Sequence, residues 1–435
     1  MLSRLLIGAC TLGISMTSVH AETITIATVN NGDMVLMQEL SEDFTNKNPN
    51  IKLEWVTLEE NILRQRVTTD IAAKGGQYDV MTIGTYEVPI WAKQDWILEL
   101  SDLGEDYDVQ DILPAIRGGL SLDGSLYAAP FYGESSMVMY RTDLMEKAEL
   151  EMPKAPTWEF IAEAAEAMTD KDNGIYGICL RGKAGWGENV ALLTAMSNSF
   201  GARWFDEDWE PQLNSSAWQA TMDYYLNVMT NYGPPGASSN GFNENLALFQ
   251  TGKCGMWIDA TVAGAFVTNA EESTVADKVG FALAPDNGLG KRGNWLWAWS
   301  LAIPAGTEKA ASALKFVSWA TSKEYQALVA SKKGWKSVPP GTRTSLYENQ
   351  AYLDAAPFAQ ITLDSINSAD PNNPSVDPVP YVGVQFVAIP EFQSIGTAVG
   401  QQLSSALAGK STAKEALESS QNLVKRSMTK AGYYR

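Results

Sequence analysis

Apolar and polar residues follow two different periods along the first part of the chain. Thr23–Ala27 alternates β-branched residues and predicts a strand, whereas Asp33–Lys47 spaces its apolar residues three and four apart, as a helix does. The same succession continues with a strand at Ile51–Val56, a helix at Glu59–Lys74 and a strand at Tyr78–Ile83. Strands that alternate with helices predict a parallel, doubly wound sheet, in which ligands lie beyond the carboxyl ends of the strands.

A second set of alternating elements follows after residue 132. Pro156–Thr169 predicts an amphipathic helix, with Thr157 as its N-cap. Asp370–Pro380 is too rich in proline for a helix or strand and predicts a loop. The remaining predicted elements are strands at Ile175–Arg181, Gly255–Asp259, Val279–Ala284 and Trp295–Ile303, and helices at Ala217–Thr230, Asn243–Gln250, Glu308–Lys332 and Gly396–Ala431.

The N-terminus has the form of an export signal. Arg4 precedes an apolar stretch that ends in Val19-His20-Ala21, a small-x-small pattern that signal peptidases accept. The stretch is shorter than the roughly 20 residues that span a bilayer. Two other interpretations are a buried helix and a lipid attachment site at Cys10, which would leave a very short apolar core. We expect residues 1–21 to be cleaved, which leaves a chain long enough for two lobes.

Composition narrows the possible functions. The formal net charge of −19 argues against a nucleic-acid partner, because phosphates are bound by Lys and Arg. The one histidine, His20, leaves with the signal, so histidine-dependent triads and histidine-ligated metal sites are excluded. We expect no cofactor and no metal. Cys179 and Cys254 either pair in an oxidising compartment or remain as two buried thiols.

Two motifs fail in their context, and one enzymatic alternative stays open. Gly288–Gly293 matches G-x-G-x-x-G but lies in a loop before a strand, where no helix can bind a pyrophosphate. Asp170–Gly174 resembles the start of a calcium loop, but the twelfth position is Arg181 instead of Glu. Glu134 and Asp259 could form the carboxylate pair of a glycoside hydrolase, although hydrogen bonding to a ligand or backbone is the simpler role.

Tryptophan gives a more specific indication. Trp295, Trp297 and Trp299 are spaced by two, which places them on one face of a strand. They could fill a core, but an aromatic face also suits the C–H edge of a sugar or polyol. Trp186 in a glycine-rich turn and Trp257 beside Asp259 are further candidates for ligand contact.

With these features the chain resembles the family 1 extracellular solute-binding proteins of ABC importers, over essentially all of residues 22–435. Within that family it is most similar to the sorbitol/mannitol-binding proteins, through Tyr132–Ser136 and Trp295–Ser300. The matching segments, in chain order, are Tyr78–Val80, Gly124–Pro130, Pro156–Trp158, Phe249–Met256, and Leu301–Pro304 before 310–316.

The resemblance implies a two-lobed α/β periplasmic binding protein fold of the maltose-binding-protein type (type II), with the ligand cleft between the lobes. The N-terminal lobe would comprise residues 22–131 and 302–345, and the C-terminal lobe residues 132–301 and 346–435. The ligand-binding residues it implies are Asn30, Asn31, Thr85, Tyr86, Tyr132, Glu134, Arg181, Trp186, Trp257, Asp259, Trp295, Trp297, Trp335 and Lys336.

The expected function is therefore capture of a sugar alcohol in the periplasm and its delivery to ABC transporter permease subunits in the inner membrane. We expect a monomer without enzymatic activity. Two alternatives remain at this point: the same fold with a monosaccharide or oligosaccharide ligand, and a secreted glycoside hydrolase.

Overall fold

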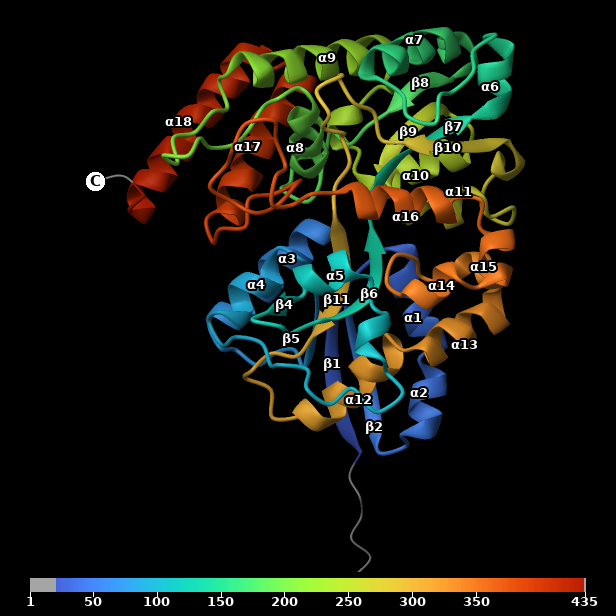
Figure 1. The fold of residues 1–435 in the computed structure, drawn as a ribbon, viewed down its shortest axis with the longest axis vertical. Coiled ribbons are helices and arrows are strands. Elements are labelled where there is room, and N and C mark those ends of the chain that lie inside the picture. Colours follow the sequence, from blue (N-terminus) through green and yellow to red (C-terminus); the bar gives the residue numbers. More distant parts are fainter. Residues whose placement is uncertain (1–20, 434–435) are drawn as a thin grey trace, which may run out of the picture.

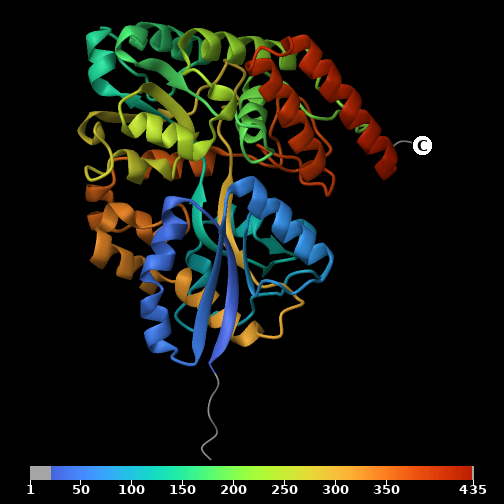
Figure 2. The same ribbon diagram turned by 180° about the vertical axis from the view of Figure 1, so that it is seen from behind.

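The computed structural model describes residues 21–433 and shows two α/β lobes stacked end to end (Figure 1, Figure 2). The N-lobe and the C-lobe, as named here, are each built around one sheet. The predicted signal segment lies outside the described residues except for Ala21, and so do Cys10 and His20. The predicted two-lobed fold is confirmed.

The N-lobe sheet has five strands in the order β2-β1-β3-β11-β6. The three N-terminal strands are parallel, as predicted, but β11 runs antiparallel to both of its neighbours, so the sheet is mixed. The reason is the direction of the chain, because β6 leads out to the C-lobe and β11 leads back. The strands are β1 (Glu22–Val29), β2 (Ile51–Leu58), β3 (Val80–Ile83), β6 (Ala129–Glu134) and β11 (Trp297–Ala302).

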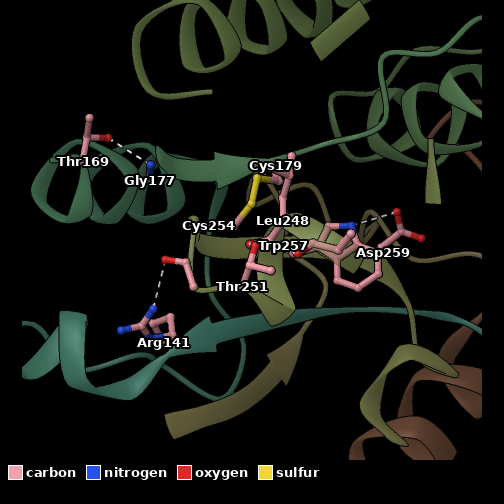
Figure 3. Close-up of a disulfide and its surroundings, with 11 residues drawn as sticks. Arg141, Thr169, Gly177, Cys179, Leu248, Thr251, Cys254, Trp257 and Asp259 are labelled. Atoms are coloured by element: carbon pink, nitrogen blue, oxygen red, sulfur yellow. Dashed lines mark hydrogen bonds between the residues drawn. A yellow bond between two sulfur atoms is a disulfide. The ribbon is translucent and has the colours of Figure 1, made fainter. Parts of the chain in front are cut away.

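The C-lobe sheet has four strands in the order β10-β7-β9-β8. They are β7 (Ser136–Arg141), β8 (Tyr176–Cys179), β9 (Cys254–Ala260) and β10 (Val279–Leu283). Cys179 and Cys254 lie on the parallel neighbours β8 and β9 and are joined by a disulfide, with 6.0 Å between their Cα atoms (Figure 3). The question that the sequence left open is thereby answered in favour of pairing.

The helices cover both faces of these sheets. In the N-lobe they are α1 (Gly32–Leu40), α2 (Glu42–Lys47), α3 (Glu60–Ala72), α4 (Glu87–Ala92), α5 (Pro114–Gly119), α12 (Ala310–Ala320) and α13 (Lys323–Lys333). In the C-lobe they are α6 (Thr142–Lys147), α7 (Trp158–Met168), α8 (Asn189–Ser199), α9 (Ser216–Tyr232), α10 (Phe242–Gln250), α11 (Ala263–Val267), α16 (Ala359–Ser368), α17 (Phe392–Leu407) and α18 (Ala413–Ala431). Two short helices, α14 (Thr344–Tyr347) and α15 (Gln350–Ala355), lie where the chain returns to the C-lobe, and β4 (Ser121–Leu122) pairs with β5 (Ser125–Leu126).

Helix starts follow the side chains that can cap them. Thr157 caps α7 as predicted, because its hydroxyl accepts a bond from the Phe160 N–H at 3.2 Å. The two long predicted helices are each broken. Asp33–Lys47 divides at Ser41, and Glu308–Lys332 divides before Ser322, whose hydroxyl accepts from Tyr325 N–H and starts a new helix.

The lobes are connected at the ends of β6 and β11, which run side by side between them (Figure 1). The predicted lobe boundaries at 131/132 and 301/302 fall inside these two strands. A third connection, which precedes α14, packs closely on β6: Gly133 N–H donates to Pro340 O at 2.9 Å. A Cβ on Gly133 would meet the Gly341 carbonyl oxygen at 2.2 Å, so only glycine fits at this crossing.

Within residues 21–433, no helix is long and apolar enough to cross a membrane. The same residues contain no group of three acidic, cysteine or histidine side chains that could hold a metal ion.

Candidate ligand-binding site

A cavity of about 100 Å³ lies between the lobes, at the carboxyl ends of the N-lobe strands. One water needs roughly 10–15 Å³ of such space, so the cavity can hold a molecule several times larger than water. Its walls come from both lobes: Asn30 and Asn31 follow β1, Tyr132 and Glu134 lie on β6, and Arg181 follows β8. A ligand here would be enclosed by both lobes at once.

On the C-lobe side, a buried ion-pair cluster forms the wall. Arg181 donates to Asp259 through Nη2 at 2.6 Å and Nε at 2.9 Å, and through Nη1 to the Gly187 carbonyl at 2.9 Å. Glu188 lies 3.3 Å from the Arg181 Nη1. Burial raises the pKa of Glu188 to about 8, with Arg181 opposing the shift. The cluster therefore fixes the Arg181 guanidinium in the cavity wall and places the Glu188 carboxyl group beside it.

Asp259 is held in position by further hydrogen bonds from its own strand. It is fully buried and also accepts a bond from the indole N–H of Trp257 at 3.0 Å and from the Ala260 N–H at 2.7 Å (Figure 3). Both of its carboxylate oxygens are thus engaged within the protein. Trp257, Asp259 and Ala260 all lie on β9, so this strand sets the position of Asp259. Asp259 supports Arg181 from outside the cavity.

On the N-lobe side, Arg64 forms a second cluster. Its guanidinium donates to Glu60 at 2.8 Å and to Glu87 at 2.9 Å, and it lies over the ring of Trp186 at 3.9 Å. It also lies 4.8 Å from the Trp297 ring centroid and 4.7 Å from that of Trp299. Cation–π contacts of this kind are strongest where water is excluded, and the Arg64 side chain is only 6% exposed. Arg64 thereby holds three tryptophans in one aromatic wall.

Glu134 faces the cavity from the end of β6. Among the described residues its carboxyl group has no hydrogen-bond partner, although Glu134 is only 6% exposed. Burial raises the pKa of Glu134 well above its usual range, and the charges of Asp259 and Glu60 add to the shift against the opposing Arg181. Its carboxyl group is therefore available to hydrogen-bond a ligand hydroxyl.

Taken together, the cavity offers flat aromatic faces, two oriented guanidinium groups and buried carboxyl groups. Aromatic faces pack against C–H groups, while the charged and neutral polar groups bond hydroxyls. Such a lining suits a small neutral molecule that has many hydroxyl groups and some apolar C–H surface.

Comparison with known proteins agrees with this chemistry. Residues 30–327 match the family described as bacterial extracellular solute-binding protein. The chain belongs to this family. A mannitol-binding protein of Pseudomonas aeruginosa is 53% identical to this solute-binding protein over 427 residues, covering 98% of either chain.

Solved structures resemble the solute-binding protein in fold as well. An ABC transporter solute-binding protein from Agrobacterium vitis S4, with bound D-mannitol, has a TM-score of 0.95 at 70% identity, covering 95% of this chain and 100% of that one. A solute-binding protein from Agrobacterium radiobacter K84, in complex with ribitol, has a TM-score of 0.82 at 22% identity, covering 94% and 99%, and shows likeness of fold alone. These relatives are described as binding proteins and not as enzymes.

The structure brings most of the predicted site residues to the cavity and leaves the others outside it. Those that line it are Asn30, Asn31, Tyr132, Glu134, Arg181, Trp186, Trp295 and Trp297. Those that do not are Thr85, Tyr86, Trp257, Asp259, Trp335 and Lys336.

Each residue outside the cavity has another place. Trp257 and Asp259 lie behind Arg181, as described above. Thr85 is buried against Gly119, and the Tyr86 hydroxyl donates to the Ile389 carbonyl at 3.0 Å. Trp335 and Lys336 form a 3-10 turn, from which the Lys336 ammonium donates to the Thr268 carbonyl at 2.6 Å.

Several cavity residues were not among those predicted. Glu60 and Arg64 are spaced by four on α3, a pattern that is typical of an exposed helical ion pair, so their sequence gave no sign of a buried site. Trp299 continues the alternating tryptophans and could have been included. The others that line the cavity are Glu59, Lys183, Glu188, Phe242, Asn243, Glu244 and Gln385, with smaller residues between them.

The carboxylate pair predicted for the enzymatic alternative, Glu134 and Asp259, is not assembled in the cavity. A glycoside hydrolase needs two carboxyl groups that flank the substrate, but Asp259 does not line the cavity and is bound to Arg181. The G-x-G-x-x-G segment is a loop closed by a bridge between Asp286 and Arg292, as its context predicted. Asp170 caps a turn by accepting from Asn173 N–H.

Proposed function

We propose that this solute-binding protein captures an acyclic polyol, with D-mannitol as the first candidate, and releases it to the permease subunits of an ABC transporter. The observation that carries the proposal is the cavity between the lobes, whose lining combines tryptophan faces with oriented arginines and carboxyl groups. Mannitol is named for both of the similar proteins described above at 53% and 70% identity. Their high coverage of the chain supports the same ligand class here.

Capture would follow from the two-lobed fold. An open form admits the ligand, and contacts from both lobes then favour the closed form, because a ligand shifts an equilibrium by its differential affinity for the two states. The permease would accept the closed form and the ligand with it. We further propose that residues 1–21 direct export to the periplasm, that the protein acts there as a monomer, and that it has no catalytic activity.

Isothermal titration calorimetry with purified protein tests this function. We expect saturable binding of D-mannitol, weaker binding of other alditols, and no binding of maltotriose. Trp295→Ala removes one aromatic face of the cavity and should weaken binding by about 10–100-fold, which corresponds to roughly 1.4–2.7 kcal/mol. Trp335→Ala is the matched control, because Trp335 lies outside the cavity.

The outcomes separate the alternatives. Binding of an oligosaccharide without any alditol would keep the family and refute the polyol. Turnover of a chromogenic glycoside, lost in Glu134→Gln, would refute the absence of catalysis. If Trp335→Ala weakened binding as much as Trp295→Ala, the assignment of the cavity as the ligand site would be wrong.

A further inference from the structure

Outside the cavity, the two lobes touch each other directly along α3 and the start of α4. Figure 1 shows these N-lobe helices just beneath α17 of the C-lobe, and Figure 2 shows the same arrangement from behind. The C-lobe contributes residues 386–393 and the turn at 183–187 to this contact. No ligand is needed to bridge the lobes here, because protein atoms bond to protein atoms.

Tyr86 is at the centre of this contact. Its hydroxyl donates to the Ile389 carbonyl at 3.0 Å and accepts from the Gln393 N–H at 3.2 Å. Its ring lies 4.7 Å from that of Trp186 and 6.1 Å from that of Phe392. Tyr86 is only 3% exposed, and its bond to Ile389 is buried, whereas the bond from Gln393 is part-buried.

Gln393 binds the N-lobe at two more points. Its side-chain oxygen accepts from the Thr68 hydroxyl at 2.9 Å, and its amide nitrogen donates to the Arg64 carbonyl at 3.4 Å. Thr68 and Arg64 lie one turn apart on α3, so one glutamine side chain spans a turn of the opposite lobe. Tyr86 and Gln393 together form a latch, and we use that term for these two residues only.

The ion pair at the cavity rim contributes less. Lys183 lies 2.7 Å from Glu59 across the two lobes, but their side chains are 27% and 34% exposed. Pairs that water can reach are screened and contribute little to stability. The latch has one buried hydrogen bond, from Tyr86 to Ile389, and three part-buried ones that involve Gln393, so it is the stronger of these two ligand-independent ties.

We propose that Tyr86 and Gln393 are positioning residues that set ligand affinity by stabilising the closed form without touching the ligand. The proposal rests on the function proposed above. Opening the lobes breaks the latch whatever ligand is bound, so the latch changes the population of the closed form by one fixed factor. Apparent affinity scales with the population of the binding-competent form. Weakening the latch should therefore weaken all ligands equally, whereas loss of a ligand contact would weaken them unequally.

Tyr86→Phe tests the proposal, because it removes only the hydroxyl and keeps the ring in place. Calorimetry with D-mannitol, D-sorbitol and D-arabitol should give dissociation constants raised by the same factor, roughly 5–10-fold for the loss of one buried and one part-buried hydrogen bond. Gln393→Ala should show the same uniformity. Tyr107→Phe is the matched control, because the buried Tyr107 hydroxyl bonds Thr321 within the N-lobe and should leave affinity unchanged.

Unequal factors among the three alditols would overturn the proposal by making Tyr86 a ligand contact. Unchanged affinity in both latch variants would overturn it as well. If the wild type bound no alditol, the proposed function would be wrong, and the latch would be tested with saccharides that do bind. An equal rise of their dissociation constants in Tyr86→Phe would support it, and unequal or unchanged constants would refute it.

Discussion

Asp33 provides a quantitative test of how burial acts on a single charge in this fold. It lies in the first turn of α1, beside the cavity residue Asn31, and its side chain is nearly inaccessible to solvent. Its carboxyl group has no hydrogen-bond partner among the described residues. Burial raises the pKa of Asp33 from 3.8 to about 7, and no neighbouring charge contributes to the shift.

The free energy follows from the two pKa values. In the unfolded chain Asp33 ionises above pH 3.8, whereas in the folded protein it keeps its proton up to about pH 7. The folded state therefore binds more protons in this window, and stability falls as the pH rises through it, by about 4 kcal/mol in total.

Asp33→Asn removes the charge and keeps the shape of the side chain. Urea unfolding at pH 5 and pH 8 should show the variant gaining on the wild type by about 2–3 kcal/mol between the two pH values. The difference between the two proteins isolates Asp33, because all other groups titrate in both. Asp172→Asn, at an exposed position, should show no such gain. Identical pH dependence of wild type and Asp33→Asn would refute the assignment of a buried, unpaired carboxyl group.

Two further predictions concern the C-lobe. Asp259→Ala leaves the Arg181 guanidinium buried without its main partner, so we expect a loss of about 3–5 kcal/mol in urea unfolding and weaker ligand binding by calorimetry; wild-type values in both would contradict the role of the pair. Replacing Cys179 and Cys254 by alanine should cost about 2–5 kcal/mol, because their bond closes a long loop with a sequence separation of 75; an unchanged unfolding midpoint against the oxidised wild type would contradict it.

Local patterns in the sequence were sufficient to predict where helices and strands of this fold lie. The β-branched alternation at Thr23–Ala27 marks β1, and Thr157 marks the start of α7. The breaks at Ser41 and Ser322 were missed because the apolar spacing continues across both serines. In each case the first helix ends only because the two helices pack as separate elements. The antiparallel β11 was missed because strand direction depends on the path between lobes, which periodicity does not record.

The site was harder to predict, because it is assembled from distant segments. The alternating tryptophans were recognisable, since spacing by two fixes a common face on any strand. Trp257 and Asp259 also share a face, but that face meets Arg181 first, so they lie behind the cavity wall. Arg64 could not be found from sequence alone, because its burial depends on Trp186 and Trp297, which reach it only after both lobes have formed.

The strand order of the N-lobe also has a consequence for synthesis and export. The strand β11, which inserts between β3 and β6, comes from residues 297–302, more than two hundred residues after β3. The sheet cannot be completed until most of the polypeptide is available, and contacts so distant in sequence form slowly. During synthesis, the N-terminal part of the chain therefore cannot form a complete domain. That delay would suit the export proposed above, in which the polypeptide crosses a membrane before it folds.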